Sequence, residues 1–135
     1  MKKFTFLDHK ADIKFRAEGK NLEELIENCV EAVAHYMVSG KKVKEKTRKK
    51  VIFEEEMDNE RLLYRIMEEI LFLLETEHFL TASAEVKISQ DKVVCVFIGD
   101  RSIDYEIQQV KAATYSEMHV KKVKGKWQAQ IVLDV

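Results

Sequence analysis

Residues 13–37, IKFRAEGKNLEELIENCVEAVAHYM, contain both of the periodicities on which the fold class depends. Every second residue from 13 to 17 is apolar, which predicts a half-buried strand, and a glycine follows it. Asn21 is a typical helix N-cap, and Glu24 is placed to complete a capping box with it. Apolar residues then recur every three or four positions, so we expect an amphipathic helix that ends near residues 39–40.

The rest of the chain repeats these two patterns without regular alternation. A second amphipathic helix should begin at Asp58, end at a break in residues 81–83 and, because its apolar stripe is wide, occupy the centre of the fold. Alternating or apolar runs predict further strands at residues 4–6, 51–55, 84–88, 93–98, 110–115, 118–123 and 127–133. We therefore expect an α+β fold, a single domain over residues 1–135 with a mainly antiparallel β-sheet and two amphipathic helices.

The composition sets limits on the function. A chain of 135 residues can bury a sizeable core without a disulfide or a metal, so a bound metal would be functional. Its formal net charge of −1 gives no overall bias toward polyanions. No apolar run is long enough to span a bilayer and the N-terminus does not read as a signal peptide, so we expect a cytoplasmic protein with no membrane partner. Cys29 and Cys95 lie in apolar patterns and are expected to be buried free thiols.

Two charged segments are expected to be solvated. Residues 41–50, KKVKEKTRKK, could contact RNA phosphates but lack interleaved aromatic residues, and an exposed loop is the simpler interpretation. Glu24, Glu27 and Glu31 recur on one face of the first helix and are expected to face solvent.

Three ionisable residues, Asp8, His9 and Asp12, fall in FLDHKADI, residues 6–13, where a turn is expected. Strand alternation places Asp12 and Asp134 on polar faces, and their carboxylates would meet if the two strands were neighbours. With the main-chain carboxylate of Val135 they would form an all-oxygen site suited to calcium or magnesium. The alternative is that Asp12, like Asp8 and His9, only shapes a turn and that Asp134 is solvated.

No catalytic group is evident. Ser116 lacks a glycine elbow, neither cysteine has an activating neighbour, and no glycine-rich loop could bind phosphate. We therefore expect a protein that is not an enzyme. A metal-dependent hydrolase that uses Asp8, His9, Asp12 and Asp134 and a general chaperone are the alternatives.

Four blocks in order resemble the archease family: FLDHKADIKFRAEGKNLEELIENCVEAVAHYM, LLYRIMEEILFLLETEHF, VKAATYSEMHVKK and the ending WQAQIVLDV. The resemblance covers residue 6 to the C-terminus and includes the D-H-x-A-D opening and the terminal Asp-plus-aliphatic ending. It implies an α+β fold with an antiparallel sheet. It also implies a protein cofactor of the GTP-dependent tRNA-splicing RNA ligase, which joins 3′-phosphate or cyclic-phosphate ends to 5′-hydroxyl ends.

Archeases promote the guanylylation and multiple turnover of that ligase, with RNA contacted only indirectly, and they bind calcium or a related divalent cation. By motif position the resemblance implies Asp12, Asp134 and Val135 as metal ligands. It implies importance for Asp8 and His9, in shaping the site or in contacting the partner, and it places Lys111 where it could face the ligase. One departure is the short stretch of residues 99–109, which lacks a histidine often found before the V-K-A-x-T-Y block.

Overall fold

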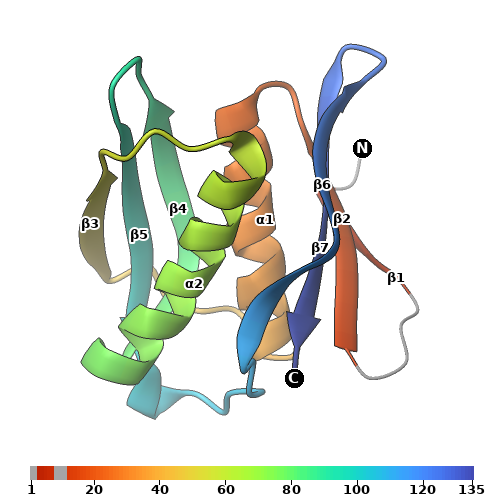
Figure 1. Ribbon diagram of the computed structural model, residues 1–135. Coiled ribbons are helices and arrows are strands. Elements are labelled where there is room, and N and C mark those ends of the chain that lie inside the picture. Colours follow the sequence, from red (N-terminus) through yellow and green to blue (C-terminus); the bar gives the residue numbers. More distant parts are fainter. Residues whose placement is uncertain (1–2, 8–11) are drawn as a thin grey trace.

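The computed structural model describes residues 3–7 and 12–135, which form two layers of β-sheet with both α-helices between them (Figure 1). The elements in chain order are β1 (Phe4–Leu7), β2 (Asp12–Gly19), α1 (Leu22–Met37), β3 (Thr47–Phe53), α2 (Asn59–Glu77), β4 (Phe79–Ile88), β5 (Val93–Arg101), the short 3-10 helix η1 (Ser102–Asp104), β6 (Ala112–Val123) and β7 (Lys126–Asp134).

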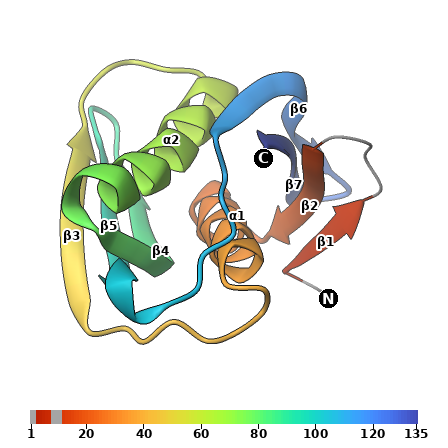
Figure 2. The same cartoon turned by 90° about the horizontal axis from the view of Figure 1, so that it is seen from below.

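The strands are divided between two sheets, and every strand pair is antiparallel. The four-stranded sheet has the order β1-β2-β7-β6, and the three-stranded sheet has the order β3-β5-β4. The view from below shows the helices filling the space between them (Figure 2). The predicted α+β class is therefore confirmed, and the antiparallel strands form two sheets. A sheet buries one apolar face, and the helices supply an apolar partner for both.

The first helix begins as predicted. Asn21 Oδ1 accepts a hydrogen bond from the Glu24 N–H at 2.8 Å, and Glu24 Oε1 accepts one from the Lys20 N–H at 3.1 Å. The returning bond of a standard capping box would come from the N-cap residue itself, so the box is displaced by one residue here. The helix buries nine of its residues, three of them alanine or cysteine, which lets both sheets approach it closely.

The prediction that α2 is the central helix is wrong. Helix α1 packs against β2 of one sheet and β4 of the other, whereas α2 lies along the open side of the layer and leaves Phe72 55% exposed (Figure 2). Because its apolar stripe is wide enough to include Phe72, the sequence predicts that α2 is covered on several sides. In the structure the neighbouring elements cover fewer sides of this helix. The width of a stripe measures how much surface could be buried, and the topology decides how much is covered.

Helix α2 begins as predicted after Asp58, whose carboxylate accepts from the Arg61 N–H at 2.8 Å, but it ends at Glu77, three residues earlier than expected. His78 adopts a left-handed conformation, φ 53°, and stops the helix. The predicted break at residues 81–83 is instead a register shift within β4. Gly99 lies opposite this shift, and a Cβ atom there would overlap the Leu80 carbonyl oxygen, so the two strands approach closely because residue 99 has no side chain.

Two of the predicted strands, residues 110–115 and 118–123, form the single strand β6. A register shift between Thr114 and His119 interrupts its pairing with β7, and Glu117 within it has φ 55°. The Ala113 N–H on the free edge of β6 donates to Glu68 Oε2 of α2 at 3.2 Å. At the other sheet β3 begins at Thr47, so the second half of the basic segment 41–50 is strand.

The acidic face of α1 is not simply solvated, contrary to expectation. The Glu27 carboxylate accepts a hydrogen bond from the Val86 N–H of β4 at 2.9 Å, and Glu31 forms an ion pair with Lys3 at 2.9 Å. Burial raises the pKa of Glu27 above its ordinary value. The face therefore covers the free edge of β4, where unpaired backbone N–H groups would otherwise attract another strand.

Candidate functional site

The first residue of β2 and the last residue of β7 are both acidic and lie together at one end of the four-stranded sheet. Asp12 is the direct cross-strand partner of Asp134, at the last position of the β2–β7 pairing. Ile13 and Leu133 are the next pair, and Leu133 is only 1% exposed, so the core begins immediately beside the two carboxylates. The sequence-based condition for a joint site, that these two strands be neighbours, is met (Figure 1).

Directly opposed residues of an antiparallel pair point to the same face, with Cβ atoms about 4.5–5.5 Å apart. The Asp134 side chain is exposed and that of Asp12 is half-buried, so both carboxylates lie at the protein surface. Two carboxylates at this spacing suit a hard, oxygen-preferring cation that also binds water.

The structure describes only some of the other residues expected at this site. Asp8 and His9 lie outside the described residues. Within residues 3–7 and 12–135 no group of three or more His, Cys, Asp or Glu side chains is placed to hold a metal ion. Two side chains, Asp12 and Asp134, therefore form the described part of the donor set, and Val135 is the third predicted donor, through a main-chain oxygen. Val135 is half-buried and packs on the core.

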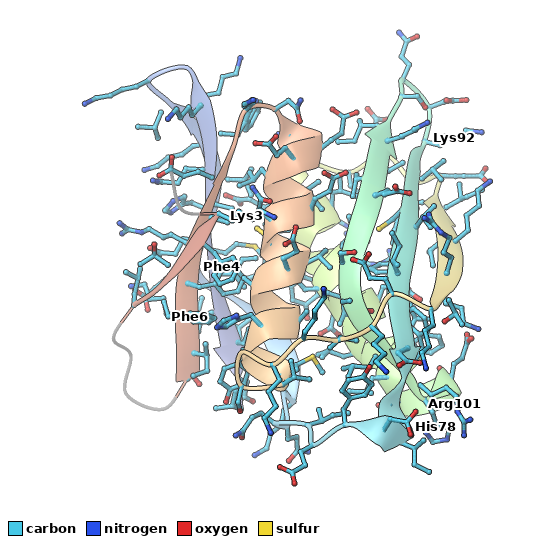
Figure 3. All side chains as sticks on the ribbon, turned by 180° about the vertical axis from the view of Figure 1, so that it is seen from behind. Lys3, Phe4, Phe6, His78, Lys92 and Arg101 are labelled. Carbon is cyan, nitrogen blue, oxygen red and sulfur yellow. The ribbon has the colours of Figure 1, made fainter. Side chains whose placement is uncertain are left out.

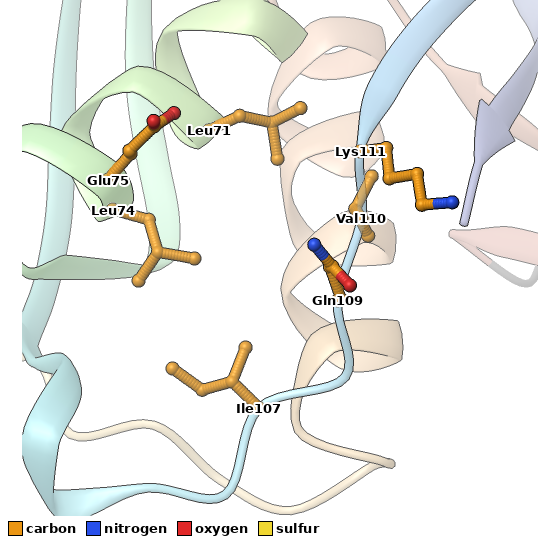
Figure 4. Close-up of a pocket in the computed structure, with 7 residues that line it drawn as sticks. All are labelled: Leu71, Leu74, Glu75, Ile107, Gln109, Val110 and Lys111. Atoms are coloured by element: carbon orange, nitrogen blue, oxygen red, sulfur yellow. The ribbon is translucent and has the colours of Figure 1, made fainter.

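Lys111 lies beside this end of the sheet. Its backbone N–H donates to the Asp134 carbonyl oxygen at 2.7 Å, which fixes the residues before β6 against the end of β7. Its exposed side chain points away from Leu71 and Leu74 of α2 (Figure 4). The structure thus brings Asp12, Asp134 and Lys111 together, three residues separated widely in the sequence.

A groove of about 590 Å³ adjoins Lys111. It runs between the second half of α2 and the extended segment 107–111, and Leu71, Leu74, Ile107 and Val110 supply its apolar lining (Figure 4). No sequence pattern predicts this groove, because the leucines read as ordinary members of the core stripe of a helix.

The segment that carries Lys111 is anchored at several points, although it follows the short stretch 99–109 that departs from the family pattern. Tyr105 donates its hydroxyl to the buried Asp100 carboxylate at 2.8 Å and accepts the Lys44 N–H at 3.0 Å. The Tyr105 hydrogen bond and that of the Arg101 N–H hold the pKa of Asp100 below its ordinary value. Further along, the Gln108 N–H donates to the Met37 carbonyl at the end of α1, at 2.7 Å.

The two cysteines are buried and free, as predicted. Burial raises the pKa of the Cys95 thiol to about 12 and raises that of Cys29 as well. A thiol with a raised pKa is a poor nucleophile at neutral pH, so neither residue adds a reactive group to the site. Among the described residues, no helix is long and apolar enough to cross a membrane.

Comparison with known proteins gives a consistent result. The family model described as the Archease protein family (MTH1598/TM1083) matches residues 4–135. Protein archease from Pyrococcus abyssi is 35% identical over 144 residues, covering 100% of both chains. Protein archease from Methanosarcina barkeri is 31% identical over 143 residues, covering 99% of this chain and 97% of that protein.

Two solved structures are similar. The solution structure of Methanobacterium thermoautotrophicum protein 1598 is 28% identical, with a TM-score of 0.71 and full coverage of both chains. The crystal structure from Thermotoga maritima, described as an archease and possible chaperone, also has a TM-score of 0.71, covering 96% of this chain and 94% of that one. Its 18% identity supports the fold alone.

Proposed function

The chain belongs to the archease family, and on that premise we propose that it is a non-catalytic activator of a GTP-dependent tRNA-splicing RNA ligase. The proposed role is to promote guanylylation of the ligase and its multiple turnover. The observation that carries the proposal is the direct pairing of Asp12 with Asp134 where β2 and β7 reach the protein surface. This pairing places two acidic side chains of the family pattern at one site.

The residues fit a divalent cation, for which calcium is the first candidate. Asp12, Asp134 and Val135 would hold it, all through oxygen. When bound, the cation would offset the repulsion between facing carboxylates and offer a positive centre to an anionic group of the partner.

The chain's own part in this role is to hold the carboxylates in place. Asp134 is paired on one side with Asp12 of β2, and on the other its carbonyl oxygen is bonded to the Lys111 N–H. The burial of Leu133 fixes the strand immediately before it. Groups that are already positioned lose less conformational freedom when the partner binds.

Asp12→Ala tests the proposal. We expect loss of calcium binding in calorimetry and loss of stimulated guanylylation and multiple-turnover joining by the ligase. The melting temperature should change little, because substitutions near the surface usually cost within about 0.5 kcal/mol. Asp104→Ala, which removes an exposed carboxylate from η1, is the matched control and should behave as wild type.

Full stimulation by a folded Asp12→Ala protein would show that the carboxylate pair is not the working part. Metal-dependent phosphatase or nuclease activity of the protein alone, lost in Asp12→Ala, would favour a hydrolase. Protection of unrelated proteins from aggregation without any effect on the ligase would favour a general chaperone.

A further inference from the structure

The hairpin that joins β6 to β7 carries a concentrated positive charge. Lys121, Lys122, Lys124 and Lys126 are all exposed and lie within six positions, and residues 118–133 contain no Asp or Glu. Lys124 and Gly125 both have positive φ, 53° and 81°, as a tight two-residue hairpin turn requires. We call residues 121–127 the lysine hairpin.

The lysine hairpin projects from the end of the four-stranded sheet opposite to the C-terminus (Figure 1). Strand β7 spans Lys126–Asp134, and at about 3.3 Å per residue the hairpin lies roughly 26 Å from the carboxylate pair. The two surfaces are therefore separate, and they carry opposite charge.

Three lysines of this hairpin, Lys121, Lys122 and Lys124, are not neutralised by ion pairs with the residues that the structure describes. Lys122 instead lies over the Trp127 ring, with its Nζ 5.6 Å from the ring centroid. The view from behind shows the ribbon of the hairpin turn at the outer end of the four-stranded sheet (Figure 3).

The segment 41–50 is more basic in sequence but is partly neutralised by the fold. Arg48 pairs with Glu85 at 2.9 Å and Lys49 with Glu77 at 2.8 Å. Lys44 and Lys46 lie close enough to Asp100 to help lower the pKa of its carboxyl group. Much of that positive charge is thus balanced within the protein, and the lysine hairpin is the better site for an external polyanion.

We propose that the lysine hairpin binds the phosphodiester backbone of RNA directly, which goes beyond the indirect contact that the family resemblance implies. Closely spaced lysines on a projecting hairpin can each neutralise one phosphate of a flexible strand. A bilayer fits less well, because Val123, 37% exposed, is the only large apolar side chain in the exposed run 121–126 and membrane-surface elements need a broad apolar face. The inference that the hairpin recognises phosphate is drawn from the hairpin alone. The choice of RNA over DNA rests on the proposed function.

The test compares two triple variants with the same loss of charge. Lys121→Gln/Lys122→Gln/Lys124→Gln alters the hairpin, and Lys41→Gln/Lys42→Gln/Lys50→Gln alters exposed residues of the other basic segment. Each lowers the formal net charge by three from −1. Thermal melting first establishes that both proteins are folded. Binding of labelled single-stranded RNA, and of DNA of the same sequence, is then measured by fluorescence anisotropy at several salt concentrations without any ligase.

We expect the hairpin variant to bind RNA about tenfold or more weakly at low salt. Its salt slope should be smaller by about 2, since each phosphate contact on a single strand contributes roughly 0.7. The other variant should bind nearly as wild type. Trp127 is the only tryptophan, so RNA should also change its fluorescence in wild type and in that control.

Unchanged RNA binding by the hairpin variant would overturn the proposal. Equal weakening of both variants would also overturn it, because net charge alone would then explain binding. If the hairpin variant lost DNA binding but kept RNA binding, the hairpin would be a DNA site, and the choice of RNA would be refuted. Co-purification of the ligase is measured in a separate experiment, and its reduction in a hairpin variant that binds RNA normally would make the hairpin a protein contact instead. Because these binding assays contain no ligase, failure of the activator proposal would not affect their result.

Discussion

The hydrogen bond and the negative charge of Glu27 have opposing effects on the stability of the fold. Its carboxylate covers the Val86 N–H at the free edge of β4, which stabilises the fold. Burial, followed by repulsion from Glu23, Glu24 and Glu85, raises its pKa above the ordinary value of 4.5 despite that hydrogen bond. The folded protein therefore holds a proton to a higher pH than the unfolded chain does, and this contribution to stability is lost as the pH rises through the raised pKa.

Replacing Glu27 separates the two effects. Glu27→Gln keeps an acceptor for Val86 and removes the titrating group, so the loss of stability as the pH rises above 4.5 should be smaller than in wild type. Glu27→Ala leaves the N–H without its acceptor and should cost about 1–3 kcal/mol. Urea denaturation over a pH series measures both. A Gln variant with the wild-type pH dependence would show that Glu27 does not titrate differently on folding.

At the scale of elements, the free edge of β4 explains the covering acidic residues, and the ends of the inner strands β2 and β7 explain the proposed metal site. Glu23 accepts from the Ile88 N–H at 3.3 Å, next to the Glu27 contact, so α1 covers two successive edge groups of β4. At the other sheet the pairing of β2 with β7 ends at Asp12 and Asp134, where the side chains leave the core. Side chains of α1 therefore protect the free edge of β4, and antiparallel pairing brings two carboxylates together at the ends of β2 and β7.

The end of β7 can be tested in two ways that differ in the backbone. Asp134→Asn removes the charge but keeps the carbonyl oxygen that accepts from Lys111, so calcium binding should be lost with little change in melting temperature. Deleting residues 134–135 also removes that acceptor and the packing of Val135, and it should lower the melting temperature as well.

Calorimetry and thermal melting of both variants provide the measurements, with Asp91→Asn in the β4–β5 turn as the control. Calcium affinity in Asp134→Asn equal to that of wild type would exclude this carboxylate as a ligand.

At the scale of the whole molecule, α1 joins the two sheets. Its buried residues face β2 and β7 on one side and β4 on the other, and the core formed by both helices and both sheets is continuous. Neither sheet can keep its apolar face covered if α1 leaves. We therefore expect the protein to unfold as one cooperative unit, as small single domains usually do.

Two probes test this cooperativity. Trp127 reports on the four-stranded sheet alone, and far-ultraviolet circular dichroism is dominated by the helices. Their urea transitions should coincide. Separate midpoints would show that the sheets form independent units and would contradict the expected single domain.

Local patterns were sufficient for the fold class, the start of both helices and the polar faces that carry Asp12 and Asp134. These features depend on side-chain alternation and on capping, which act over a few residues. The archease blocks, which are also local, identified the family. Which helix is central was not accessible in this way, because α1 owes its position to sheets built from distant strands.

Only the tertiary structure decided which charges remain available. The segment 41–50 is the more basic stretch in sequence, but Glu77, Glu85 and Asp100 reach it from other elements. Lys121, Lys122 and Lys124 of the lysine hairpin form no ion pair with residues 3–7 or 12–135. Likewise, the predicted polar faces of β2 and β7 became a joint site only through their adjacent pairing. Electrostatic interactions depend on separation in space, and two residues 122 positions apart, Asp12 and Asp134, become neighbours only when the chain folds.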